Sequence, residues 1–287
     1  MLYLILAILF AAALSIVLKV FGEGKGNRFG IILGNYLTCV AFALAFLPQK
    51  NAVTAFPRIP LVCGVVAGLF YVGGIVSMQS SVVKNGASVT AAFAKLGLVV
   101  AVGLSLFFGE KPGVFQIAGI LIALAAVVLM NTESKKTREE KGEKRRFSPL
   151  LIAVLLTGGG SEGMSKVFDE IGTEDEKPLF LFYLFATAAV LATVLLVIEY
   201  RRTRKKLYFR ELAAGVAVGA PNYLSSYMLL KSLSVLPGVV AYPVSSGGAI
   251  LVVTAVSVAL LGERPTKRQA VGLGLILLSL VLLNLPA

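Results

Sequence analysis

The stretch Gly109-Glu110-Lys111-Pro112 occurs a second time in this chain, as Gly262-Glu263-Arg264-Pro265. The register between the two copies then holds without a gap, since Gln116 matches Gln269, Gly119 matches Gly272 and Asn131 matches Asn284. An apolar run of helix length precedes and follows each copy. A short polar connector between two such runs is typical of a turn at a membrane face, and its recurrence indicates two copies of one unit.

The composition is that of an integral membrane protein. The 287 residues are 57% hydrophobic, and the mean hydropathy is +0.87. Successive apolar runs of about 18 to 22 residues are long enough to cross ~30 Å of hydrocarbon. They predict ten membrane-spanning helices, at 2–21, 29–47, 59–81, 88–108, 114–131, 149–168, 178–199, 211–233, 240–261 and 269–285.

Two further pairs of matching segments support the duplication. Lys19-Val20-Phe21 returns as Lys166-Val167-Phe168, and the pair of small residues Gly64 and Gly68 returns as Gly215 and Gly219. Small residues four apart allow two membrane helices to pack closely, so we expect both pairs at helix contacts. Because each copy has five helices, the second copy must enter the bilayer inverted. The predicted fold is therefore an all-α integral membrane protein with ten transmembrane helices in two five-helix inverted repeats.

The repeats are predicted at 1–131 and 149–287, joined by a charged linker at 132–148. Lysine and arginine are distributed unequally between the two sets of loops, with 19 on the side of the linker and 4 on the side that holds both termini. The positive-inside rule then places both termini outside the cytoplasm. We expect a multi-pass protein of the cytoplasmic (inner) membrane of a prokaryote.

Several classes of function find no support in the sequence. The chain has no histidine, and Cys39 and Cys63 both fall inside predicted spans, so neither a metal site nor a disulfide framework is expected. No motif of a zinc hydrolase, a serine hydrolase or a nucleotide-binding loop is present, which argues against an enzyme and against direct use of ATP. We expect no cofactor and no nucleic-acid partner. The expected partners are the lipid bilayer and a small-molecule metabolite, and the sequence is silent on oligomeric state.

The chain resembles the drug/metabolite transporter superfamily, and within it the ten-helix EamA-like transporters. The resemblance covers nearly the whole chain. It rests on the Gly-Glu-Lys/Arg-Pro motifs, on the Gln and Gly that follow each motif, and on Pro243 ahead of the second one. It implies a carrier whose cavity lies between the two halves. Members of the superfamily move substrates as different as amino acids, nucleotide sugars and drugs, so the resemblance does not fix a substrate.

Charged residues inside the predicted spans are candidates for substrate binding, because intramembrane charge is costly. They are Lys19, Lys95, Lys166, Lys231 and Glu162. Lys19, Lys166 and Lys231 lie near helix ends, where a lysine can extend its ammonium group to the interface. Lys95 is seven residues inside its predicted helix, about 10 Å deep at 1.5 Å per residue, and we expect it to line a cavity.

Glu162 precedes Lys166 by four residues, the spacing of a helical ion pair. The pair either neutralises itself or exchanges the lysine for a proton or an amine substrate during transport. Gly158-Gly159-Gly160 loosens the helix just before Glu162, and transporters place binding sites at such weakened helices.

Polar and aromatic candidates accompany these charges. Asn222, Tyr223 and Tyr227 precede Lys231 on one helix, and Tyr242 and Ser246 stand beside Pro243 on the next. Tyr71 is a further candidate on the helix of the first glycine pair. The alternative for this group is polar packing between helices. For Glu110 and Glu263 we expect a structural role, in which each carboxylate binds the first backbone amides of the helix that follows it.

The leading interpretation is a secondary transporter that moves a small polar metabolite by alternating access, with its cavity between the two inverted repeats. Four lysines against one glutamate inside the spans favour an anionic or zwitterionic substrate. One alternative is an exporter of cationic or amphipathic compounds that uses Glu162 and the tyrosine faces. An alternative of another class is a channel or a non-transporting scaffold, although the inverted duplication favours a carrier.

Overall fold

The computed structural model describes residues 1–22, 28–48, 53–85, 87–131, 148–204, 208–261 and 266–285. Apart from short turns, these ranges are helical, and they contain no strand. The helices of the first repeat are α1 (Leu2–Gly22), α2 (Arg28–Phe46), α3 (Arg58–Asn85), α4 (Ala87–Leu96), α5 (Leu98–Phe107) and α6 (Val114–Asn131). The second repeat contains α8 (Pro149–Ile171), the short 3-10 helix η2 (Glu174–Glu176), α9 (Lys177–Thr203), α10 (Phe209–Leu233), α11 (Gly238–Leu261) and α12 (Lys267–Leu283).

Each predicted span corresponds to a helix, and the all-helical fold is confirmed. Among the described residues, five helical segments are long and apolar enough to cross a membrane, judged by length and composition: Phe29–Phe46, Arg58–Asn85, Val89–Phe107, Glu174–Thr203 and Gly238–Ala259. Leu2–Leu18 and Val114–Met130 are apolar but shorter. Within the predicted helix 88–108, α4 and α5 meet at Gly97, and the two together form the apolar segment Val89–Phe107.

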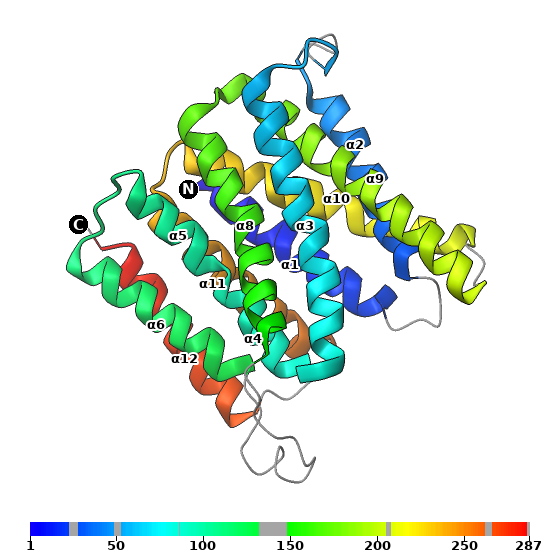
Figure 1. The fold of residues 1–287 in the computed structure, drawn as a ribbon. Helices are drawn as coiled ribbons and strands as arrows, with labels where there is room; N and C mark the ends of the chain where they lie inside the picture. Colours follow the sequence, from blue (N-terminus) through cyan, green and yellow to red (C-terminus); the bar gives the residue numbers. More distant parts are fainter. Residues whose placement is uncertain are drawn as a thin grey trace. The chain divides into compact units, whose positions relative to one another are not determined.

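The chain divides into two compact units, and each unit combines helices of both repeats. Unit 1 comprises Met1–Val72 and Met164–Pro237, and unit 2 comprises Gly73–Gly163 and Gly238–Ala287. Unit 1 therefore contains α1, α2, η2, α9 and α10, whereas unit 2 contains α4, α5, α6, α11 and α12 (Figure 1). The helices α3 and α8 run through both units, and the chain passes from one unit to the other inside each of them.

The glycine pairs of unit 1 lie at helix contacts, as the sequence predicted. A Cβ built on Gly64 of α3 would lie 2.7 Å from the carbonyl oxygen of Phe180 in α9. A Cβ on Gly215 of α10 would lie 2.5 Å from the carbonyl oxygen of Ile31 in α2. Gly68 and Gly219 repeat this relation one turn later. Each repeat thus packs its third helix on the second helix of the other repeat, so the same contact occurs twice with the repeats exchanged.

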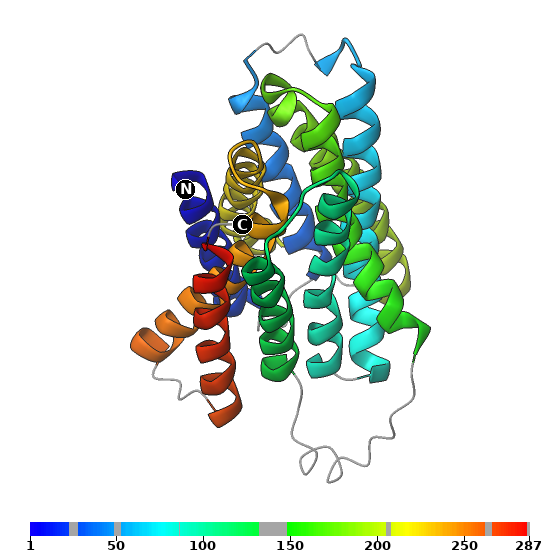
Figure 2. The same ribbon diagram turned by 90° about the vertical axis from the view of Figure 1, so that its left-hand side faces the viewer.

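Unit 2 shows the same exchange between α6 and α12, which lie side by side in both ribbon views (Figures 1 and 2). Gly119 of α6 faces Leu283 of α12, and its counterpart Gly272 of α12 faces Met130 of α6. Met130 and Leu283 are themselves matching residues, 153 positions apart like the two glycines. Contacts that recur with their partners exchanged are the result of a two-fold relation between the repeats.

The Gly-Glu-Lys/Arg-Pro motifs differ from the prediction in the role of their glutamate. The two carboxylate oxygens of Glu110 accept hydrogen bonds from the backbone amides of Gly238 (2.8 Å) and Val239 (2.9 Å), in the first turn of α11, which is not the helix that follows Glu110 in the sequence. The amide dipoles and the positive end of the α11 helix favour a carboxylate there. Glu263 lies outside the described residues.

The glutamines of the motifs cap the helices instead. The side-chain oxygen of Gln116 accepts from the backbone amide of Gly113 at 3.2 Å, and that of Gln269 accepts from the amide of Thr266 at 2.8 Å. Thr266 completes a capping box by accepting from the amide of Gln269. The matched glutamines therefore start α6 and α12, a role that the sequence comparison did not identify.

Candidate substrate-binding site

The break between α4 and α5 lies against α8, and only glycine permits this contact. A Cβ built on Gly97 would lie 2.7 Å from the backbone nitrogen of Gly159. The tightest approach is therefore between two backbones, with no flexible side chain to move aside. The break stands near the middle of the apolar segment Val89–Phe107. Interrupted helices at the middle of the membrane expose backbone groups for binding ions and substrates.

Two charged residues of opposite sign flank this crossing. Lys95 lies two residues before Gly97 on α4, and Glu162 lies three residues after Gly159 on α8. Lys95 is the charged group that acts electrostatically on Glu162. The Glu162 side chain is half-buried and Lys95 is exposed. Lys95 comes from the first repeat and Glu162 from the second, so both repeats contribute to this part of unit 2.

The helix α11 supplies a third side chain to the same place. The hydroxyl of the buried Tyr242 donates a hydrogen bond of 3.0 Å to the backbone oxygen of Glu162. Tyr242 follows Gly238 by one turn, and Glu110 holds the amide of Gly238. Pro243 lies inside the helix immediately after Tyr242, and Ser246 is half-buried one turn further on. We refer to Lys95, Glu162 and Tyr242 as the unit 2 cluster.

The other tyrosine and asparagine candidates form a separate group within unit 1. The Tyr71 hydroxyl donates to the side-chain oxygen of Asn222 at 2.9 Å, and the Asn222 amide donates to the side-chain oxygen of Asn35 at 3.0 Å. The rings of Tyr223 and Tyr227 stack with their centroids 5.9 Å apart. These five residues are the unit 1 cluster. The buried Tyr223 hydroxyl has no hydrogen-bond partner among the described residues.

Comparison with known proteins identifies the family. The model of the EamA-like transporter family matches residues 1–132 and again 149–285, which together are nearly the whole chain. This chain belongs to the EamA-like transporter family. It is an integral membrane protein and a membrane transporter with the two-repeat helical fold of that family.

A solved structure, "Crystal structure of protein", has the same fold. It superposes with a TM-score of 0.73 at 18% sequence identity, and the match covers 99% of this chain and 95% of the other. At this identity the likeness concerns the fold alone. A comparison with curated proteins gave no match.

The EamA-like family model matches each repeat separately. The charged residues of the unit 2 cluster differ from the residues at the corresponding positions of the other repeat. In the register of the two motifs, Lys95 corresponds to Gly248, 153 residues later. In the register of α1 and α8, Glu162 corresponds to Ser15, 147 residues earlier. Gly64, Gly68, Gly119 and Gln116 have matching residues in the second repeat, whereas these charges are present once.

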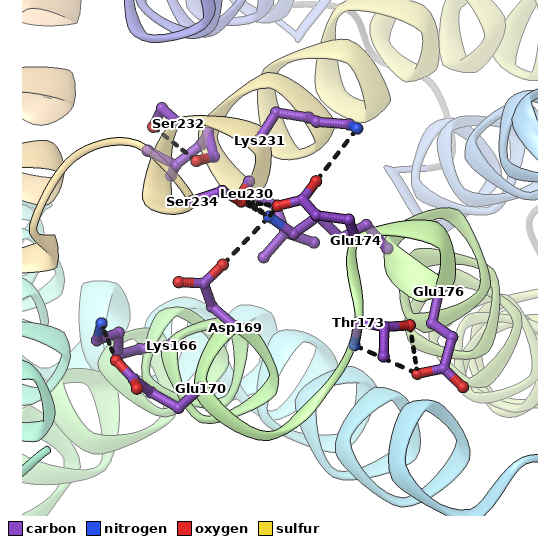
Figure 3. A network of polar contacts seen from close by, with 12 residues as sticks. Lys166, Asp169, Glu170, Thr173, Glu174, Glu176, Leu230, Lys231, Ser232 and Ser234 are labelled. Carbon is purple, nitrogen blue, oxygen red and sulfur yellow. Dashed lines mark hydrogen bonds and ion pairs between the residues drawn. The ribbon is translucent and has the colours of Figure 1, made fainter.

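Lys166 and Lys231, two further candidates in this transporter, are bound to carboxylates near helix ends. Lys166 forms an ion pair of 2.5 Å with Glu170 on the same helix (Figure 3). Glu170, like Glu162, is four residues from Lys166, and it lies nearer the end of α8. Lys231 binds Glu174 at 3.2 Å, and its ammonium group lies 5.9 Å from the ring centre of Tyr227. The side chain of Lys19 lies outside the described part of the structure.

The start of α9 carries a buried lysine that sequence analysis did not select. Lys177 is 3% exposed and binds Asp169 at 3.2 Å, Glu174 at 2.6 Å and the backbone oxygen of Leu230 at 2.8 Å. It also donates to the hydroxyl of Ser234. Lys177 begins α9 just outside the predicted span, so its position gave no sign that it is buried. Asn35 was missed as well, although an asparagine within an apolar run is a signal that could have found it.

Proposed function

We propose that this transporter is a secondary carrier for a small zwitterionic metabolite, which the unit 2 cluster binds. The observation that carries the proposal is the position of Lys95 on α4 and of Glu162 on α8, each within three residues of the contact between Gly97 and Gly159, with Lys95 near enough to act on the charge of Glu162. A lysine ammonium binds a carboxylate, and a glutamate carboxylate binds an ammonium group. Two opposite charges therefore offer one site for each end of a zwitterion and offset the hydration that it loses in the membrane.

The departure from the repeat supports a role in binding for these two residues. The glycines at the α2–α10, α3–α9 and α6–α12 contacts and the capping glutamines occur in both copies. Lys95 and Glu162 have Gly248 and Ser15 as counterparts. Intramembrane charges that the fold does not repeat need another reason, and contact with a polar substrate is such a reason.

Alternating access is the mechanism that we propose for transport. In an inverted repeat, two arrangements of similar energy open a midplane site to opposite sides of the membrane. We further propose that the termini lie outside the cytoplasm in a prokaryotic inner membrane, as the distribution of loop lysines and arginines indicates. Cysteines introduced at 140 and 203 should then react with a reagent added on the same side of the membrane, because 140 lies in the basic linker and 203 at the basic end of α9.

A cationic or amphipathic substrate is the second candidate, and the unit 1 cluster bears on it. Stacked tyrosines can bind a cation through their ring faces. Here the ammonium group of Lys231 already lies 5.9 Å from the ring centre of Tyr227. In the other unit, Lys95 supplies a positive charge near Glu162. Both observations favour a zwitterion over a cation.

The test compares three ligands of one size: a linear amino acid, the same chain without its amine, and the same chain without its carboxylate. Thermal stabilisation of the purified protein measures binding, since a ligand that binds the folded state raises the melting temperature. We expect the amino acid to bind most tightly. Lys95→Met and Glu162→Gln should each weaken its binding by roughly 10- to 100-fold, the worth of one hydrogen bond to a charged group.

Lys84→Met is the matched control, because Lys84 is exposed in the last turn of α3. It should leave binding unchanged. Binding of the amine alone, dependent on Glu162 and independent of Lys95, would contradict the zwitterion and support the cation exporter. Flux through proteoliposomes that neither saturates nor accelerates with substrate on the opposite side would contradict a carrier and indicate a channel.

A further inference from the structure

The end of α9 and the start of α10 carry a group of exposed arginines and aromatic residues. The group comprises Tyr200, Arg201, Arg202, Arg204, Tyr208, Phe209 and Arg210, and all seven are exposed. Phe209 is 84% exposed. The guanidinium of Arg210 lies 5.9 Å from the ring centre of Tyr208. Within the described ranges, no carboxylate pairs with any of these four arginines. We call this the arginine–aromatic surface.

The length of α9 places this surface at the level of the lipid headgroups. The helix has 27 residues, which at 1.5 Å per residue is about 40 Å, whereas the hydrocarbon core is ~30 Å thick. Its other end is held in the polar network of Lys177. The last turn therefore emerges from the hydrocarbon, where tyrosine and phenylalanine rings meet the acyl boundary and arginine reaches phosphate groups.

The backbone of Arg204 is a separate indication of a function for its side chain. Arg204 caps α9 with φ 56°, in the left-handed region, and its amide donates to the backbone oxygen of Tyr200 at 2.8 Å. Glycine takes this conformation without steric cost, whereas a side chain costs free energy there. An arginine at a position that suits glycine indicates that the guanidinium contributes something that glycine cannot.

We propose that the arginine–aromatic surface binds the headgroup of an anionic phospholipid. A guanidinium donates two parallel hydrogen bonds to phosphate, which an ammonium group cannot do. The exposed rings favour a ligand whose acyl chains continue into the membrane over a phosphate that is free in solution. The site lies within unit 1 and is independent of the substrate that the protein transports.

The absence of tryptophan from the sequence gives a direct measurement. Phe209→Trp introduces a single fluorophore within the surface. Its quenching by brominated phosphatidylglycerol, relative to brominated phosphatidylcholine, reports which lipid lies next to it in vesicles of mixed composition. We expect a preference for phosphatidylglycerol of about tenfold, on the order of the worth of one hydrogen bond to a charged group. Phe115→Trp, at the exposed start of α6, is the control reporter and should show no preference.

Three variants in the Phe209→Trp background separate the site from its alternatives. Replacing Arg201, Arg202 and Arg204 by lysine retains the charge that orients the protein but removes the paired hydrogen bonds, and it should abolish most of the preference. Arg204→Gly should lower the preference while leaving the melting temperature unchanged or higher. Arg210→Lys tests the arginine that lies at the Tyr208 ring, and it should lower the preference for phosphatidylglycerol less than the triple lysine variant does.

Three results would overturn the proposal. Equal quenching by the two lipids would show that no anionic lipid is selected. If the triple lysine variant keeps the full preference for phosphatidylglycerol, positive charge alone attracts the anionic lipid and the surface has no specific site for phosphate. Loss of the preference on adding inorganic phosphate, at an ionic strength held constant with chloride, would show a site for a soluble anion.

Discussion

Lys177 and Lys231 bind the same carboxylate from different surroundings. The side chain of Lys177 is 3% exposed, and that of Lys231 is 27% exposed. Lys177 also binds Asp169, whose side chain is 10% exposed. A buried ammonium group holds its neighbours' charges in a medium of low dielectric constant, whereas an exposed one exchanges its partner for water. Two lysines that share Glu174 should therefore differ in their contribution to stability.

We predict that Lys177→Met lowers the free energy of unfolding by ~3–5 kcal/mol, because it leaves Asp169 buried without its partner. Lys231→Met should cost no more than ~1 kcal/mol, as expected for a solvent-exposed pair. Chemical unfolding of the purified variants in detergent measures both. Equal losses in the two variants would contradict the assignment of Lys177 as the centre of this network.

At the residue scale, the sequence selected charged side chains within the apolar runs but did not predict which groups they contact. The choice of Lys95 and Glu162 followed from the cost of charge within an apolar run. The ion pair of Lys166 with Glu170 was not predicted, although its four-residue spacing within a helix is the same as that of Glu162 with Lys166. Glu110 shows the same limit. A carboxylate at a helix start was expected, but the helix was assigned by closeness in sequence, whereas α11 begins 128 residues after Glu110.

The elements pack in pairs that exchange the repeats, and this makes a symmetric prediction. A Cβ on Gly68 would lie 2.6 Å from the backbone oxygen of Leu184, and one on Gly219 would lie 2.6 Å from that of Asn35. Both obstacles are backbone atoms and cannot rotate away. Replacing Gly68 by alanine should therefore push α3 away from α9, and replacing Gly219 by alanine should push α10 away from α2.

We predict that Gly68→Ala and Gly219→Ala lower the free energy of unfolding by similar amounts, about 1–3 kcal/mol, the usual cost of overpacking. Gly103→Ala on α5 is the control, since a Cβ there meets nothing within 4 Å. It should be neutral or stabilising, because alanine is the better helix former. Thermal unfolding in detergent measures all three. A large loss in one glycine variant and none in the other would contradict the exchange of contacts.

The elements themselves were mostly predictable, because long apolar runs bounded by charges determine where membrane helices begin and end. The division of 88–108 into α4 and α5 was not. Gly97 is one of many glycines in the chain, and nothing in its neighbours distinguishes it. Its effect comes from Gly159, which lies 62 residues away in the sequence and approaches so closely that neither residue can carry a side chain. A break caused by a tertiary contact cannot be derived from local sequence.

At the scale of the whole molecule, the duplication visible in the sequence does not coincide with the compact units of the structure. The repeats are consecutive, whereas each unit takes helices from both. Packing explains this, because the matched glycines join helices of opposite repeats and so interlock the two halves. The sequence identified the repeated parts, and the contacts between them determine how they are grouped.

The points where the chain passes between the units are therefore candidates for bending during transport. They lie between Val72 and Gly73 in α3, between Gly163 and Met164 in α8, and between Pro237 and Gly238. A glycine stands at each point, and glycine within a helix lowers the cost of local bending. Hinges are a few residues that absorb the backbone change when compact parts of a protein move.

We predict that Gly73→Ala slows transport without weakening substrate binding. The added Cβ would lie 3.4 Å from the Thr157 methyl carbon, an ordinary contact, so packing should be kept. Alanine stabilises a straight helix by up to ~1 kcal/mol relative to glycine, which corresponds to roughly a fivefold lower rate if α3 must bend in the slow step. Counterflow in proteoliposomes measures the rate, and ligand-induced thermal stabilisation measures binding. Gly103→Ala adds the same methyl group away from any passing point and should transport at the wild-type rate. Equal rates for Gly73→Ala and Gly103→Ala would place the movement elsewhere in the chain.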